Sequence, residues 1–270
     1  MNKKSLLNNL IVLLAAFALL LSPVLAKNDN AIEVDIPDQD GIYDVPGHQE
    51  LKLRVIVHKE KPAKTDPEAL QSFVCTLSDP DSLSFIGATG WYLATTTPFV
   101  YTLNPSSVPA SIGASNLPKI AENSFKVWTD AIGNKVTISR NPINTLIAKK
   151  ALDGKNIIAW NRLSKSILGV TYTWYYTSTG LVAEIDTIMN KSVAWSWSNP
   201  TTWPLPYICA DKYSYDAQNI LTHEIGHWFG LIDRYETDYA ANTMYGYGSK
   251  METKKDTLTE GDILGVEAIY

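Results

Sequence analysis

The stretch that decides the fold runs His223-Glu224-Ile225-Gly226-His227-Trp228-Phe229-Gly230-Leu231-Ile232-Asp233. Residues four apart lie on the same face of a helix, so His223 and His227 can both point at one metal ion. Glu224 lies one position further round, within reach of a water molecule on that metal. Gly230 permits the left-handed backbone that ends a helix, and the turn brings Asp233 round as a third ligand. Two imidazoles, one carboxylate and an open fourth position are typical of a catalytic zinc site.

Histidines are scarce in this chain, which narrows the choice of a third ligand. The sequence contains four of them, and none follows His227. Asp233 is therefore the best-placed third ligand, and Glu236 and Asp238 are the alternatives. A carboxylate adds negative charge to the site, so it should soften the Lewis acidity of a bound zinc ion relative to three neutral imidazoles.

Length, composition and charge limit the classes of protein to which the chain can belong. At 270 residues it can form one large domain or two small ones. A hydrophobic content of 45% is normal for a globular protein. The net charge of −5 and the lack of a basic stripe argue against a nucleic-acid partner.

The first 26 residues have the three parts of a secretory signal peptide. Lys3 and Lys4 form a positive start, residues 10–21 are an unbroken apolar run, and Val24 and Ala26 provide a cleavage site. The apolar run is short for a membrane span. We expect this segment to be removed and the mature protein to be secreted, without stable membrane association. An uncleaved N-terminal anchor is the alternative.

Residues 27–74 are densely charged and contain several prolines. Within them, residues 51–57 alternate between apolar and polar side chains, with His58 on the polar side, which predicts a strand. We interpret 27–74 as an N-terminal extension or as a pro-segment, two alternatives that the residues leave open. Residues 75–270 then form the domain that carries the zinc motif.

From residue 91 onward, the apolar patterns indicate a mixture of strands and helices. We expect strands over 99–103, 136–138, 156–160, 168–176 and 181–189. We expect helices over 115–131 and 216–229, and 259–270 has apolar residues at helical spacing. This mixture predicts an α+β domain.

Three stretches together resemble the metzincin metallopeptidases, in the bacterial and archaeal form of the matrixin branch. They are HEIGHWFGLID at 223–233, the Met-containing turn NTMYGYG at 242–248, and the terminal LTEGDILGVEAIY at 258–270. The resemblance implies a twisted, mixed five-stranded sheet with an active-site helix and a C-terminal helix. It also implies a zinc-dependent endopeptidase, here expected to be a monomer, whose peptide substrates bind as an added strand along a sheet edge. Matrixins usually place a third histidine where this chain has Asp233.

The resemblance also implies roles for single residues. Glu224 is the expected general base, because it can take a proton from the zinc-bound water and pass it to the leaving amine. Met244 is expected to form an apolar floor beneath the histidines without binding the metal. Tyr245 and Tyr247 are expected to form walls of the pocket, and donation to the oxyanion is the alternative.

Two further features concern bonds and metals outside the zinc motif. Cys75 and Cys209 are the only cysteines, and in an exported protein they predict one disulfide. The alternative is implied by the resemblance to matrixins, whose pro-segment cysteine lies shortly before the first strand and caps the zinc as a thiolate. Cys75 has a similar position ahead of Trp91 and would be such a latency switch. The acidic loop 211–216 allows a calcium ion.

Two other functional classes compete with the peptidase. One is an exported binding module that keeps the fold and has lost catalysis. The other is a zinc hydrolase with another substrate, such as an amidase. The retention of His223, Glu224 and His227 favours the enzyme over the binding module, and the Met-turn and terminal helix argue against the amidase.

Overall fold

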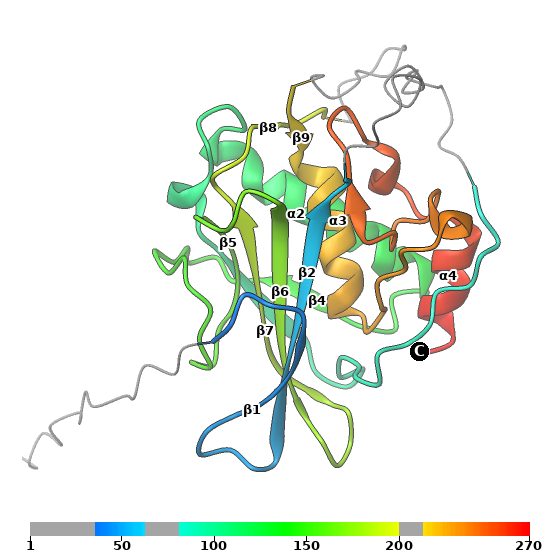
Figure 1. Ribbon diagram of the computed structural model, residues 1–270. Coiled ribbons are helices and arrows are strands. Elements are labelled where there is room, and N and C mark those ends of the chain that lie inside the picture. Colours follow the sequence, from blue (N-terminus) through cyan, green and yellow to red (C-terminus); the bar gives the residue numbers. More distant parts are fainter. Residues whose placement is uncertain (1–35, 63–80, 200–212) are drawn as a thin grey trace, which may run out of the picture. The chain divides into compact units, whose positions relative to one another are not determined.

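One large sheet runs through the computed structural model, which describes residues 36–62, 81–199 and 213–270 (Figure 1). It has eight strands in the order β1-β2-β6-β7-β5-β3-β4, and β10 pairs with β2 outside this path. The strands are β1 Gly41–Asp44, β2 Leu51–Glu60, β3 Phe99–Leu103, β4 Ile138–Arg140, β5 Asn156–Asn161, β6 Ile167–Tyr176, β7 Val182–Asn190 and β10 Tyr247–Gly248. A separate two-stranded sheet joins β8 Trp195–Ser196 to β9 Tyr215–Asp216.

The sheet is mixed in direction. Strands β4, β3, β5 and β7 run parallel to one another, whereas β6 is antiparallel to both of its neighbours, β7 and β2. β1 is antiparallel to β2, and β10 is parallel to it. The predicted α+β class is therefore confirmed, and β3 to β7 correspond to the five strands expected between residues 99 and 190.

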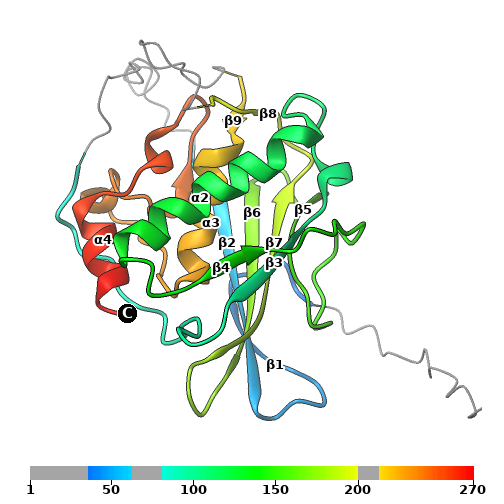
Figure 2. The same ribbon diagram turned by 180° about the vertical axis from the view of Figure 1, so that it is seen from behind.

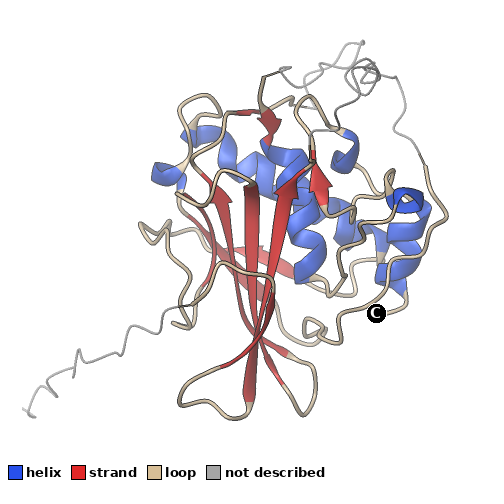
Figure 3. Ribbon diagram, in the orientation of Figure 1, coloured by secondary structure: helices blue, strands red, loops and turns tan. Residues whose placement is uncertain are grey.

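Helices cover one face of this sheet (Figures 2 and 3). The described residues contain three α-helices: α2 Leu117–Ala131, α3 Ala217–Trp228 and α4 Glu260–Glu267. Trp128 of α2 is buried between the helices, and its indole N–H donates to the Thr222 carbonyl of α3 at 2.9 Å. The apolar core between helices and sheet includes Ile56, Leu168 and Ile225. The opposite face of the sheet has a second apolar cluster.

Strand β2 belongs to this sheet, although the sequence places it in a separate extension. It pairs with β6 from Leu51 opposite Tyr176 to Lys59 opposite Ile167. Its side chains are buried on both faces, because Val55 faces one apolar cluster and Ile56 the other. The compact unit accordingly extends over Ile36–Tyr270, and the boundary expected at 74/75 does not divide it. Removal of 27–74 as a pro-segment stays a prediction.

The predicted elements agree with the observed ones to within about two residues at each end, the usual uncertainty of such bounds, except at the ends of β2 and α4. The terminal helix stops at Glu267, whereas helical spacing continues to 270. The signal peptide, Cys75 and Cys209 lie outside the described residues. Within the described ranges, no helix is both long and apolar enough to cross a membrane.

Candidate metal centre

The helix α3 begins and ends as the motif requires. Asp216 caps its start, where the carboxylate accepts hydrogen bonds from the main-chain N–H groups of Gln218 and Asn219 at 2.9 and 3.0 Å. The helix ends at Trp228, and Gly230 adopts φ +92°. A Cβ atom at Gly230 would lie 2.3 Å from the Trp91 carbonyl oxygen, so the turn requires glycine.

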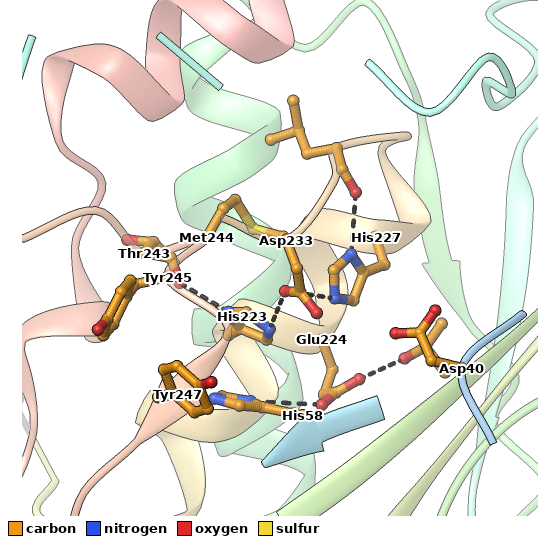
Figure 4. Close-up of polar contacts among 12 residues, drawn as sticks. Asp40, His58, His223, Glu224, His227, Asp233, Thr243, Met244, Tyr245 and Tyr247 are labelled. Atoms are coloured by element: carbon orange, nitrogen blue, oxygen red, sulfur yellow. Dashed lines mark hydrogen bonds and ion pairs between the residues drawn. The ribbon is translucent and has the colours of Figure 1, made fainter. Parts of the chain in front are cut away.

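The turn brings Asp233 to the two histidines, as predicted (Figure 4). Its Oδ1 lies 3.0 Å from Nε2 of His223 and 3.4 Å from Nε2 of His227. Both imidazoles are fully buried, and only 6% of the Asp233 side chain is exposed. The three ligand atoms lie within 4.8 Å of one another, so these residues could hold one metal ion.

The hydrogen bonds of the two imidazoles determine which nitrogen faces this cluster. Nδ1 of His223 lies 2.7 Å from the Thr243 carbonyl, and Nδ1 of His227 lies 2.9 Å from the Leu231 carbonyl. A carbonyl only accepts, so each Nδ1 carries a proton and, in the neutral ring, each Nε2 presents a lone pair. These lone pairs face the Asp233 carboxylate, and the three atoms lack a well-formed hydrogen bond among the described residues. A cation between them would satisfy all three.

The electrostatics of the cluster favour the metal-binding protonation states of His223 and Asp233, whereas His227 must lose a proton to bind metal. Burial lowers the pKa of His223 to about 4. Burial alone would raise the pKa of Asp233, but His227 and His223 hold it well below its usual range. For His227, burial lowers the pKa and the Asp233 carboxylate raises it, with a net increase. In the metal-free chain a proton on His227 can therefore bridge to Asp233, and a metal ion would displace it.

Glu224 is buried beside the cluster with one oxygen held and the other without a well-formed hydrogen bond in the described part of the chain. Trp228 donates to the Thr187 hydroxyl, Thr187 and Thr171 share a hydrogen bond, and Thr171 donates to Glu224 Oε2 at 2.6 Å. Its Oε1 lies against Gly169, where a Cβ atom would come within 2.7 Å. Burial raises the pKa of Glu224 to about 7, which suits a group that exchanges protons near neutral pH.

The Met-turn packs beneath α3. Met244 is buried, and its sulfur lies so close to Gly226 that a Cβ atom there would be 2.2 Å away. This agrees with the expected apolar floor. Asp262 of α4 holds the turn, because its carboxylate accepts from the N–H groups of Thr243 and Met244 at 2.8 and 3.1 Å. The terminal helix thereby positions the carbonyl that orients His223.

Two residues that were not predicted as site residues from the sequence contact the cluster. Tyr235 donates its hydroxyl to Asp233 Oδ2 at 3.0 Å, which fixes the carboxylate. His58 of β2 packs its ring over His223, with 3.8 Å between ring centroids, and its Nδ1 lies 3.5 Å from Glu224 Oε1. His58, His223 and Glu224 form a second group that could hold a metal ion. The scarcity of histidines was the one sequence signal for His58.

Lys255 is a buried cation next to this group. Its Nζ donates to the carbonyls of Tyr245 and Tyr247 at 2.5 and 3.1 Å and lies 3.1 Å from Nε2 of His58. Burial lowers the pKa of Lys255 to about 8. The rings of Tyr245 and Tyr247 pack edge to face, with 5.6 Å between their centroids. That they form walls of a substrate pocket stays a prediction.

The other candidate ligands do not join the cluster. Glu236 is exposed and pairs with Arg234 at 3.2 Å, and Asp238 is exposed on a short 3-10 helix. In the described part of the acidic loop, Asp216 uses its carboxylate to cap α3. Within the described ranges, the two groups at His223 are the only sets of three or more His, Cys, Asp or Glu side chains that converge closely enough to hold a metal ion. Calcium binding stays a prediction.

Comparisons with known proteins do not assign the chain to a family. No family model matches the sequence, and no curated protein matches it significantly. The site is therefore interpreted from its own geometry.

Proposed function

We propose that the chain is a zinc-dependent endopeptidase and that His223, His227 and Asp233 hold the zinc. The observation that carries this is the convergence of two imidazole lone pairs and an ionised carboxylate on side chains that are all buried. Two nitrogen ligands and one oxygen ligand suit zinc, and three protein ligands are the usual number in a catalytic zinc site. When bound, zinc lowers the pKa of a coordinated water and polarises a carbonyl group.

Glu224 supplies the proton transfers in this proposal. Thr171 holds Oε2, so Oε1 is the oxygen that takes a proton from the attacking water. A carboxyl with a pKa of about 7 can then return that proton to the leaving amine. This role is compatible with the position of Glu224 next to, but outside, the cluster of His223, His227 and Asp233.

The fold supports a matrixin-like metzincin as the structural class. The order β4-β3-β5-β7-β6 gives a mixed five-stranded sheet, with α3 carrying the site and α4 supporting the Met-turn. We further propose export after removal of residues 1–26, a monomeric state, and protein or peptide substrates. An inactive binding module would need no proton-transferring Glu224, whereas an amidase would use it as well. The strand position that β2 fills against β6 favours an extended peptide as the substrate.

The burial of the site sets a condition on this activity. His223, Glu224 and His227 are fully buried, and β2 lies across them between β6 and β10. A peptide can reach Glu224 only after β2 moves or is removed. This favours the pro-segment alternative for residues 27–74, and it predicts that the full chain binds zinc but cleaves slowly until the segment is displaced.

The decisive experiment combines metal analysis with an assay on casein, before and after limited proteolysis of the full chain. Wild type should bind about one zinc per chain and gain activity on proteolysis. Glu224→Gln should bind the same zinc and stay inactive. Glu184→Gln, which changes a buried glutamate on β7, is the matched control and should stay active. Zinc-loaded, processed wild type without activity on casein would exclude the peptidase and leave the binding module or a zinc hydrolase with another substrate.

A further inference from the structure

Strand β2 lies in the sheet as a bound peptide would. It is antiparallel to β6 on one side and parallel to β10 on the other. The main-chain N–H of Glu60 donates to Ser166 at 2.9 Å, and that of Lys61 donates to Gly248 at 2.9 Å. An extended peptide that joins a sheet edge makes the same main-chain bonds and places alternate side chains in pockets. The side chains of β2 therefore show which pockets this groove offers.

The side chain of His58 fills one such pocket beside the metal cluster (Figure 4). The His223 ring forms one wall, with 3.8 Å between ring centroids. Gly248 of β10 forms another, because a Cβ atom there would lie 3.3 Å from His58 Nε2 and 2.6 Å from a methyl group of Leu168. The imidazole is fully buried. The Glu224 carboxylate lies on the Nδ1 side of the ring, with its Oε1 at 3.5 Å, so the end of the pocket decides which group Nε2 meets.

The pocket ends on the ammonium group of Lys255. An ammonium has three N–H donors, and each has an acceptor here: the Tyr245 carbonyl, the Tyr247 carbonyl and Nε2 of His58. The two carbonyls belong to the pocket wall and stay in place. The third acceptor comes from whichever strand occupies the groove.

We propose that Lys255 is the specificity-determining residue of this pocket, and that it selects substrate side chains carrying a hydrogen-bond acceptor. Histidine, glutamine and the acidic residues meet this need, whereas an aliphatic side chain would leave a buried charged donor unpaired. A hydrogen bond to a charged group contributes about ten- to hundredfold in binding. This inference rests on the peptidase proposed above, since the substrate is what replaces β2.

A permanent core contact between His58 and Lys255 is the competing explanation, and the cleavage products described below separate the two. Small molecules first test whether Lys255 chooses the group that fills the pocket. In metal-free, full-length His58→Gly, imidazole and pyrrole can each refill the space. The two rings have the same size, but only imidazole has an acceptor nitrogen. Imidazole should raise the melting temperature with an apparent affinity about tenfold or more above that of pyrrole. The further change Lys255→Met should abolish this preference. Equal effects of both rings in both proteins would overturn the proposal.

A second pair of variants covers the case in which His58→Gly does not fold. His58→Gln keeps an acceptor and His58→Leu does not, and both fill the pocket. Gln should give the more stable protein with Lys255 present, and Leu the more stable one in the Lys255→Met background. The same order in both backgrounds would show that Lys255 does not choose the side chain.

Sequencing of cleavage products tests the consequence for substrates. Casein fragments produced by the wild-type protein after limited proteolysis should be enriched, at one position beside the cut bond, in His, Gln, Glu or Asp. Processed Lys255→Met should lose this enrichment and favour aliphatic residues there. Aliphatic enrichment by both proteins would overturn the proposal. Absence of any cleavage would instead reject the peptidase, and with it the role of Lys255 in substrate choice. The experiment with imidazole and pyrrole would still show whether Lys255 selects the group that fills the pocket.

Discussion

Two glutamates in this molecule have the same shifted pKa and different surroundings. Glu224 on α3 is fully buried and Glu184 on β7 is 2% exposed, and burial raises the pKa of each to about 7. Glu184 uses both oxygens, which accept from the main-chain N–H groups of Asp153 and Gly154 at 3.0 and 2.6 Å. Glu224 has one oxygen held by Thr171. Its spare oxygen, Oε1, lies next to metal-binding side chains and accepts no hydrogen bond among the described residues, and His58 Nδ1 approaches it to 3.5 Å.

The difference shows what distinguishes a reactive carboxylate from a structural one. Glu184 and Asp186 stand on the same face of β7, and both hold the loop that leads into β5, since Asp186 accepts from the N–H groups of Ala151 and Ile157. A raised pKa therefore reports burial at both sites. The spare oxygen beside the metal cluster is the feature that only Glu224 has, and four experiments test that contrast.

The largest effect is expected on catalysis. After limited proteolysis, Glu224→Gln should lower kcat/KM on a peptide substrate by about 10²- to 10⁴-fold, because it removes the group that transfers protons. Glu184→Gln should change kcat/KM by little, since Glu184 touches no part of the cluster. If both variants lost kcat/KM to a similar extent, at equal zinc content and folding, the loss would not depend on the position of Glu224 beside the cluster.

Metal removal should lower the stability of the folded chain only where the metal-binding side chains are intact. Zinc at a thousandfold excess over its Kd stabilises the folded chain by about 4 kcal/mol, and a chelator should remove that contribution. Thermal denaturation should show the same loss for wild type and Glu184→Gln. Asp233→Ala, which lacks a ligand, should show little or none. A full chelator effect in Asp233→Ala would place the zinc elsewhere.

The pH dependence of folding should depend on Glu184. Its pKa is about 7 in the folded chain and 4.5 in the unfolded one, so the folded chain binds more protons between these values. Its contribution to the free energy of unfolding is present below pH 4.5 and is lost as pH rises through 7, by at most about 3 kcal/mol. Urea denaturation at pH 5 and 7.5 should show a smaller difference for Glu184→Gln than for wild type. Equal differences would assign the slope to other groups.

The smallest effect is expected at Glu224 Oε2, the oxygen to which Thr171 donates a hydrogen bond. Thr171→Val removes the donor to Glu224 Oε2, and kcat/KM should fall by about tenfold because the carboxylate is less well oriented. Thr173→Val is the matched control two residues along β6, since its buried hydroxyl lacks a hydrogen-bond partner within the described ranges. It should leave kcat/KM unchanged. Similar losses in both variants would point to general packing of β6.

Much of the site was predictable because its parts are close in sequence. The four-residue spacing of His223 and His227 on one helix face, followed by a glycine turn to Asp233, depends only on local backbone geometry. The structure brings these three side chains together. The helix and strand positions were predictable for the same reason, since periodicity is a local property.

The remaining contacts depend on residues far apart in the chain. The alternation in residues 51–57 predicted a strand but not its partner, and β2 pairs with β6, more than a hundred residues later. That pairing alone brings His58 over His223 and next to Lys255. Tyr235 and Asp262 are equally unmarked, since their roles depend on where loops return.

The sequence by itself thus determined the metal cluster, because helix geometry and one left-handed glycine suffice to build it. Only the tertiary structure decided that β2 closes the site and that the pocket beside it ends on a buried ammonium. Strand pairing is selected by the total burial and main-chain bonding of the whole sheet, and the period of a single strand contains no information about its partner.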